Sequence, residues 1–124
     1  MKSENKGIRR ILKAFTYSMD GLKSAFKSEE ALRQETFLSV VLLIIAILLN
    51  VTYIEKLLLI TSLFSIVLAE LTNTAIEVVI DRISEEYHIL SKKAKDIGSS
   101  LVLIAFIYAI TVWLTIIVNN YMLQ

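Results

Sequence analysis

The chain contains no cysteine and no proline, and only three of its 124 residues are glycine. The lack of cysteine excludes disulfide bridges, thiolate metal sites and cysteine nucleophiles. So few glycines exclude the glycine-rich phosphate loops of P-loop and Rossmann nucleotide-binding proteins. The first 27 residues are charged throughout and lack the compact apolar region of a cleavable signal peptide. The formal net charge is only +1, so we expect no nucleic-acid partner.

Apolar residues are abundant, since 56% of the chain is hydrophobic and 20% is charged. From Gln34 onward the charge is segregated, because long apolar runs alternate with short charged connectors. The runs 36–54, 57–80 and 101–118 are each about long enough to cross a hydrocarbon core of ~30 Å at ~1.5 Å per residue. The sequence therefore predicts an all-α integral membrane protein, a single domain over residues 1–124 with three membrane-spanning helices.

The N-terminal segment has a different pattern, in which apolar residues recur at helical spacing and basic residues flank them. A helix with an apolar stripe and basic flanks lies flat in the headgroup layer of an anionic leaflet. The sequence therefore predicts an amphipathic surface helix over about residues 7–27. Its stripe consists of Ile8, Ile11, Leu12, Phe15, Met19, Leu22 and Phe26.

The distribution of lysine and arginine predicts the orientation in the membrane. Residues 1–35 carry eight of these residues and the 81–98 connector carries four, which makes 12 on one side. The turn between the first two spans carries one, Lys56, and the C-terminal tail carries none. By the positive-inside rule, the N-terminus and the 81–98 connector lie in the cytoplasm and the C-terminus lies outside.

The second span carries a line of acidic and amide side chains within its apolar run. Glu70, Asn73, Glu77 and Asp81 stand at i, i+3, i+7 and i+11, so on a helix they share one face. A carboxylate within hydrocarbon costs several kcal/mol and is rarely found there without a task or a partner. Two carboxylates with an amide between them suit the binding of a divalent cation and the transfer of a proton.

Other polar residues are expected to gather at the same cytoplasmic interface as this face. Mg²⁺ is typically held by one or two carboxylates plus substrate phosphates, and phosphoryl transfer also needs a cation on the transferring group. Without a glycine loop, Mg²⁺, Lys95 and Arg10 would have to meet the phosphate charge. Glu70, set deeper than the others, could accept a proton from a hydroxyl group. The gathered residues are Arg10, Glu29, Glu35, Glu85, Glu86, Tyr87, His88, Lys95 and Asp96.

Residues 69–82, which read AELTNTAIEVVIDR, resemble the signature of the prokaryotic diacylglycerol kinases. The resemblance continues through residues 86–88 and 94–99 and extends over roughly residues 7–118. It implies a homotrimeric enzyme of the bacterial inner membrane, with a surface helix and three spans in each subunit. It also implies Mg²⁺- and ATP-dependent phosphorylation of diacylglycerol to phosphatidic acid, in sites shared between neighbouring subunits.

The resemblance also implies a role for individual residues. By this resemblance Glu70 matches the position of the catalytic base, with Asn73 as its polar partner and Lys95 next to the charge that develops during transfer. Glu29 and Glu77 match the positions of the Mg²⁺ ligands. The implied nucleotide-binding residues are Arg10, Tyr17, Glu29, Glu77, Glu86, Tyr87, His88, Lys95 and Asp96. The implied lipid-binding residues are Arg10, Glu35, Glu70, Ser99 and Trp113.

Alternative interpretations are open at this point. A sister group of the same family phosphorylates undecaprenol instead of diacylglycerol. A non-enzymatic membrane subunit, used for assembly or ion passage, would explain a mid-span carboxylate but would not need the polar 81–98 connector. Taken alone, His88 is typical of a solvated loop residue, and Trp113 is equally typical of packing or of an interfacial anchor.

Overall fold

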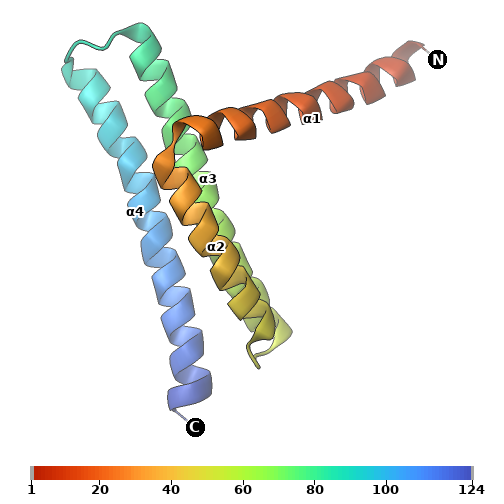
Figure 1. Cartoon of the computed structure of the whole chain (residues 1–124), viewed down its shortest axis with the longest axis vertical. Coiled ribbons are helices and arrows are strands. Elements are labelled where there is room, and N and C mark those ends of the chain that lie inside the picture. Colours follow the sequence, from red (N-terminus) through yellow and green to blue (C-terminus); the bar gives the residue numbers. More distant parts are fainter. Residues whose placement is uncertain (1, 124) are drawn as a thin grey trace. The chain divides into compact units, whose positions relative to one another are not determined.

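A computed structural model describes residues 2–123, with side chains from residue 6 onward. This described part is helical, which confirms the all-α prediction. The chain divides into two compact units, Met1–Glu30 and Ala31–Gln124, and each is described by itself (Figure 1). The elements are α1 (Lys2–Ser28), α2 (Glu30–Leu48), α3 (Tyr53–Ile83), α4 (Ile89–Ile117) and the π-helical turn η1 (Val118–Met122).

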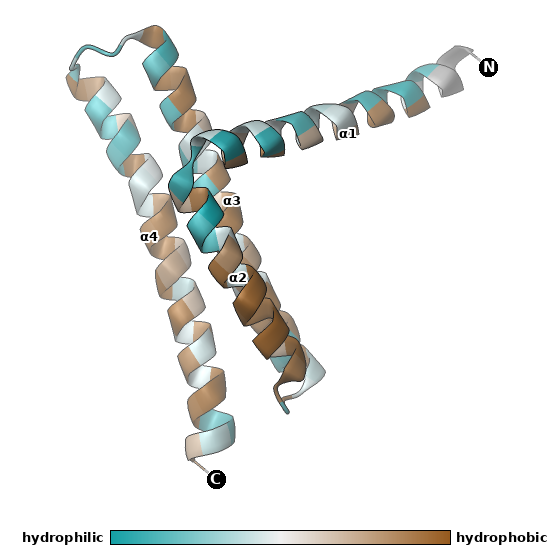
Figure 2. Cartoon of the chain, in the orientation of Figure 1, coloured by the Kyte–Doolittle hydropathy of each residue, from teal (hydrophilic) through white to brown (hydrophobic). Residues whose placement is uncertain are grey.

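The first unit is the single amphipathic helix α1, which is longer than the predicted 7–27 segment. Its apolar stripe is exposed, with Ile11 at 67% and Phe15 at 66% exposure. Figure 2 shows hydrophilic and hydrophobic residues alternating along it. An exposed apolar stripe on a long helix is what a membrane-surface helix would present to lipid.

Helix α2 corresponds to the predicted run 36–54, but it ends at Leu48 because residues 49–52 form a turn. The turn is set by a capping box, in which the Glu55 N–H donates to Thr52 Oγ1 at 3.2 Å and the Thr52 N–H donates to Glu55 Oε1 at 3.1 Å. The Lys56 ammonium donates to the carbonyl of Ile47 at 2.8 Å, which satisfies an unpaired carbonyl at the end of α2.

Helices α3 and α4 form a long antiparallel hairpin, joined by the loop of residues 84–88 (Figure 1). Ile66 of α3 packs against Ala105 and Ala109 of α4. Small residues at such an interface let two helix backbones approach closely, which is how helices associate in membranes. The hairpin fixes the register between the polar residues of α3 and those of α4.

The three helices of the second unit meet near the α2–α3 turn, in a region we call the turn end. Ala46 of α2, Leu59 of α3 and Ile116 of α4 form a buried cluster there. The Trp113 indole N–H donates to Ser62 Oγ at 3.1 Å, and Ser62 is fully buried. The turn end is therefore held by both apolar packing and an interhelical hydrogen bond.

Polar side chains of η1 also bind the turn end. The Asn120 amide donates to Glu55 Oε2 at 2.7 Å, and the Asn50 N–H donates to the Tyr121 hydroxyl at 3.1 Å. The hydrogen bonds from Asn120 and from the Thr52 backbone lower the pKa of Glu55 below its ordinary value. The charged Glu55 side chain thus links the capping box to the C-terminal turn through hydrogen bonds.

Two helices of the described part are long and apolar enough to cross a bilayer, α2 and the continuous helix Ile89–Met122. Many of their large apolar side chains are exposed. Figure 2 shows long hydrophobic stretches, in brown, along both ribbons. The buried polar residues of the unit, Ser62, Glu70 and Thr74, all lie on α3 instead.

Candidate functional site

The centre of the candidate site is a contact between two acidic side chains, Glu70 of α3 and Glu35 of α2. Glu70 is only 7% exposed, and the Glu35 side chain lies close enough to interact with it electrostatically. Two carboxyl groups in contact can share a hydrogen bond only when one of them carries a proton, so such a pair is suited to proton transfer.

Three buried side-chain oxygens near this pair have no hydrogen-bond partner within the described residues. They are Glu35 Oε2, Thr36 Oγ1 and Asn73 Oδ1. Buried polar atoms are nearly always paired, so unpaired ones call for a ligand or another group to complete them. Glu35 lies beside Glu70, Thr36 follows Glu35 in the chain, and Asn73 lies one helical turn from Glu70, so we call this region the acid end. Within the described residues its buried polar atoms are not all paired.

Asn73 is held in place by the close approach of α4. Gly98 is buried, and a Cβ atom added at this position would meet Asn73 Oδ1 and Ile76. The absence of a side chain at position 98 therefore makes room for the Asn73 amide one helical turn from Glu70.

A cationic group lies farther along the same face of α3. Lys95 of α4 pairs with Asp81 at 2.9 Å, and Glu77 also acts on it electrostatically. Asp81 raises the pKa of Lys95 above its ordinary value, so the ammonium stays charged at neutral pH. This arrangement brings three of the predicted residues of α3 and α4 together, with a fixed positive charge next to Glu77.

An open groove of about 440 Å³ lies at the end of the α3–α4 hairpin. Its lining includes five of the predicted nucleotide-binding residues. His88 is the N-cap of α4, and its Nδ1 accepts a hydrogen bond from the Leu90 N–H at 3.1 Å. The loop geometry therefore depends on His88. The five residues are Glu86, Tyr87, His88, Lys95 and Asp96.

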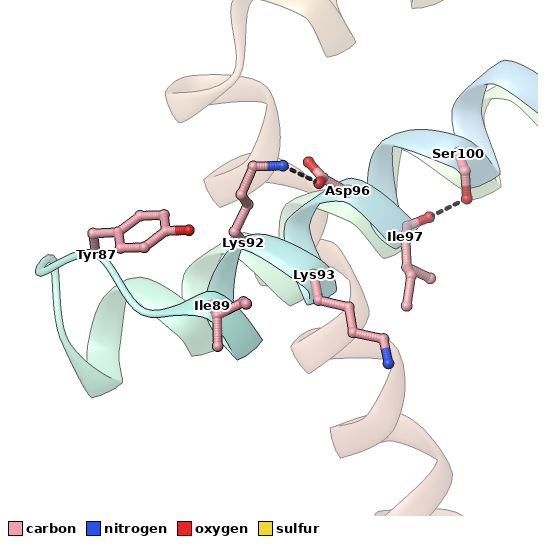
Figure 3. A pocket seen from close by; sticks show the side chains of 7 residues that line it. All are labelled: Tyr87, Ile89, Lys92, Lys93, Asp96, Ile97 and Ser100. Atoms are coloured by element: carbon pink, nitrogen blue, oxygen red, sulfur yellow. Dashed lines mark hydrogen bonds and ion pairs between the residues drawn. The ribbon is translucent and has the colours of Figure 1, made fainter.

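A second groove of about 480 Å³ borders the first and shares Tyr87, Lys92 and Asp96 with it. Figure 3 shows Tyr87 beside the Lys92–Asp96 ion pair, whose atoms are 2.6 Å apart. Lys93, Ser100 and two isoleucines complete the lining. The 84–88 loop and the start of α4 therefore carry aromatic and basic groups on an open surface.

The other predicted residues line neither groove, and the two in the second unit are Ser99 and Trp113 of α4. Ser99 is exposed on α4 directly after Gly98, whereas Trp113 lies 14 residues farther along the helix, about 21 Å away. Trp113 belongs to the turn end through its bond to Ser62. In the first unit, Arg10 and Tyr17 are exposed on α1 and Glu29 is partly buried between α1 and α2.

The carboxylates fit a Mg²⁺ ion that is completed by nucleotide phosphates. No group of three or more acidic or histidine side chains that could hold a metal occurs among the described residues. Mg²⁺ needs only one or two carboxylates when phosphates supply further oxygens. Glu77, which is partly exposed beside Lys95, offers such an oxygen donor next to a positive charge.

The comparisons with known proteins show that the chain belongs to the prokaryotic diacylglycerol kinase family. The sequence profile of a family described as prokaryotic diacylglycerol kinase matches residues 16–117. A diacylglycerol kinase of Escherichia coli is 42% identical over 121 residues, which cover 98% of this chain and 99% of that protein. Those of Haemophilus influenzae and Pseudomonas aeruginosa are 44% and 43% identical, over 86% and 91% of this chain and 91% and 92% of the relatives.

Proposed function

We propose that this chain, which belongs to the prokaryotic diacylglycerol kinase family, is a membrane enzyme that transfers a phosphoryl group from ATP to the primary hydroxyl of diacylglycerol. The observation that carries the proposal is the contact of the buried Glu70 with Glu35 beside unpaired polar atoms, on the helix whose C-terminal end lines a charged groove. A proton acceptor and a phosphate-binding surface on one helix face are what a kinase of lipid alcohols requires.

In the proposed reaction, Glu70 accepts the proton of the lipid hydroxyl as its oxygen bonds to the γ-phosphorus. The bond between that phosphorus and the β–γ bridging oxygen breaks, and ADP leaves. Asn73 orients the Glu70 carboxylate, and Lys95 stabilises the negative charge on the phosphoryl group during its transfer.

The remaining predicted residues hold the nucleotide in this proposal. Mg²⁺, when bound, neutralises phosphate charge. Glu29 and Glu77 are its proposed ligands, while Arg10 and Tyr17 join the loop residues and Asp96 as nucleotide contacts. Ser99, Trp113, Arg10 and Glu35 are proposed to form the lipid-binding surface with Glu70.

We further propose three spans, with the N-terminus and the α3–α4 loop in the cytoplasm and the C-terminus outside the inner membrane. The proposal rests on the lysine and arginine distribution. A homotrimer with shared sites is proposed because the family resemblance implies it, and one observation supports association of subunits. The acid end leaves buried polar oxygens unpaired within one chain, and neighbouring subunits would shield it from lipid.

The test is an assay of the purified protein with MgATP and either diacylglycerol or undecaprenol in mixed micelles. We expect Mg²⁺-dependent formation of phosphatidic acid, with undecaprenol a poor acceptor. Preferential phosphorylation of undecaprenol would assign the chain to the other branch of activity. ATP consumption that neither lipid stimulates would contradict the kinase proposal.

Shared sites can be tested by mixing subunits. Glu70→Gln and Glu29→Gln chains, each inactive alone, are expected to regain activity when they assemble together if one site takes residues from two subunits. Failure of the mixed assemblies to regain activity would show that each subunit has its own complete site. Size-exclusion chromatography with light scattering gives the number of chains in each assembly.

A further inference from the structure

An apolar groove of about 210 Å³ runs between α2 and α3 in the second unit. One side is formed by Val40 and Leu43 of α2, and the other by Ile60, Leu63, Phe64 and Val67 of α3. The groove is smaller than typical pockets for whole small molecules, which measure about 300–1,000 Å³. A flexible hydrocarbon chain suits both its size and its lining.

One end of this groove is polar and leads to the acid end. Thr36 and Ser39 line it there, and Thr36 Oγ1 is buried without a partner among the described residues. Glu35, next to Thr36 in the chain, contacts Glu70, which follows Val67 by three residues on α3. An elongated ligand with an apolar tail and a polar head would therefore bring its head to Glu70.

We infer that this groove binds one acyl chain of the lipid acceptor and that the Thr36 hydroxyl donates a hydrogen bond to the ester carbonyl of that chain. The inference rests on the proposed function and specifies how the acceptor is oriented. From Thr36 to Leu43 the groove follows seven residues of α2, about 10 Å of chain length. The groove thus selects for a chain long enough to reach Leu43.

The groove acts on orientation more than on affinity. Lipid tails are as apolar as the groove walls, so a chain that moves from the bilayer into the groove gains little free energy of transfer. Its effect is to fix the position of the hydroxyl against Glu70. Misplacement of a reacting group by about 1 Å can cost on the order of a hundredfold in rate.

The test blocks the far end of the groove and compares acceptors of different length. Leu43→Phe fills the groove, whereas Ile44→Phe adds the same bulk at a neighbouring residue that is 53% exposed and does not line it. We expect Leu43→Phe to lower kcat/KM for dioleoylglycerol by about tenfold to a hundredfold, with dihexanoylglycerol unaffected. Ile44→Phe is expected to leave both values unchanged.

Equal loss with both acceptors, or no loss with either, would overturn the inference. A changed number of subunits in the Leu43→Phe protein would show that another copy of the chain occupies the groove, which would also overturn it. A diacylglycerol with a photoreactive group in its acyl chain provides a readout without catalysis. We expect it to label groove residues of α2 and α3 in the native protein and much less in Leu43→Phe.

The polar end has its own test, with ester-linked and ether-linked acceptors. Thr36→Val keeps the shape of the side chain but removes the hydroxyl. We expect it to lower kcat/KM for diacylglycerol by about fivefold, as for loss of one hydrogen bond, and to leave the ether-linked analogue unchanged. If the native protein phosphorylates diacylglycerol but the photoreactive lipid labels residues outside the groove, only the inference about acyl-chain binding is refuted. If the native protein does not phosphorylate diacylglycerol, the proposed function is refuted.

Discussion

The turn end and the acid end of the second unit use polar residues in opposite ways. At the turn end, Glu55 accepts from Thr52 and Asn120, and Trp113 donates to Ser62. At the acid end, the carboxyl groups of Glu35 and Glu70 lie together, and three buried side-chain oxygens have no hydrogen-bond partner among the described residues. Both ends bury polar groups at a cost, but only the turn end recovers this cost within the chain.

The two ends differ in whether their buried polar groups have hydrogen-bond partners among the described residues. Paired groups stabilise the fold, and unpaired groups are candidates for binding a ligand or another subunit. A fully paired network makes a helix junction rigid. An incomplete one is maintained only if something else completes it, either substrate or a neighbouring subunit. Substitutions at the two ends should therefore separate cleanly, with loss of activity at one end and loss of stability at the other.

The largest expected effect is at the acid end. Glu70→Gln keeps the shape of the side chain but removes the proton acceptor, so we expect kcat to fall by roughly 10²–10⁴-fold, with little change in the KM for ATP. Steady-state kinetics with diacylglycerol would measure both values. Full activity in this variant would remove Glu70 as the base and would leave the contrast between the two ends unexplained.

The second effect concerns the metal. Glu77→Gln removes a proposed Mg²⁺ ligand, and we expect the Mg²⁺ concentration for half-maximal activity to rise by at least about tenfold, since even groups behind metal ligands contribute that much. Titration of activity with Mg²⁺ at fixed ATP is the measurement. Asp20→Asn, which changes an exposed acid of α1 outside the predicted site, serves as the control. An unchanged Mg²⁺ requirement in Glu77→Gln would refute the ligand role.

At the turn end, Ser62→Ala leaves the Trp113 indole N–H without its acceptor. We expect a loss of about 1 kcal/mol in the free energy of unfolding and an unchanged KM for lipid. Ser65→Ala is the matched control, because its hydroxyl bonds only to the Ser62 carbonyl of the same helix. A raised KM for lipid in Ser62→Ala or in Trp113→Phe would instead support the predicted lipid-binding role of Trp113.

The smallest effect is the pH response of the turn end. A carboxylate whose pKa is lowered on folding stabilises the fold above its unfolded pKa, and this contribution disappears as the pH falls through the folded value. We therefore expect the contribution of Glu55 to the free energy of unfolding to decrease only below about pH 4. Unfolding midpoints measured from pH 3 to 7 should show a drop in the native protein that is smaller in Glu55→Gln. An identical drop in both proteins would show that other groups cause it.

The helices themselves follow from sequence patterns, but one boundary does not. Residues 49–54 are mostly apolar and contain neither glycine nor proline, so hydropathy alone extends the first span through the turn. The signal that could have placed the turn is Thr52-x-x-Glu55, a capping box in front of an apolar run. Local hydrogen bonding here overrides the apolar pattern.

The site was predictable only within single helices. Spacing along α3 places Glu70, Asn73, Glu77 and Asp81 on one face, because helical periodicity needs no partner. The contact of Glu35 with Glu70 and that of Trp113 with Ser62 depend on the register between helices. That register is set by packing, as at Ile66 and Ala105, and periodicity within one helix contains no information about it.

Gly98 sets the spacing between the two helices of the hairpin, α3 and α4. Because position 98 has no side chain, the amide of Asn73 lies directly against the backbone of α4, and the width of one amide sets the distance between the two helices. Any larger residue at position 98 would push the two helices apart between Glu70, the proposed proton acceptor, and Lys95, the cation proposed to stabilise the transferring group. The spacing of the helices and the alignment proposed for catalysis would then change together.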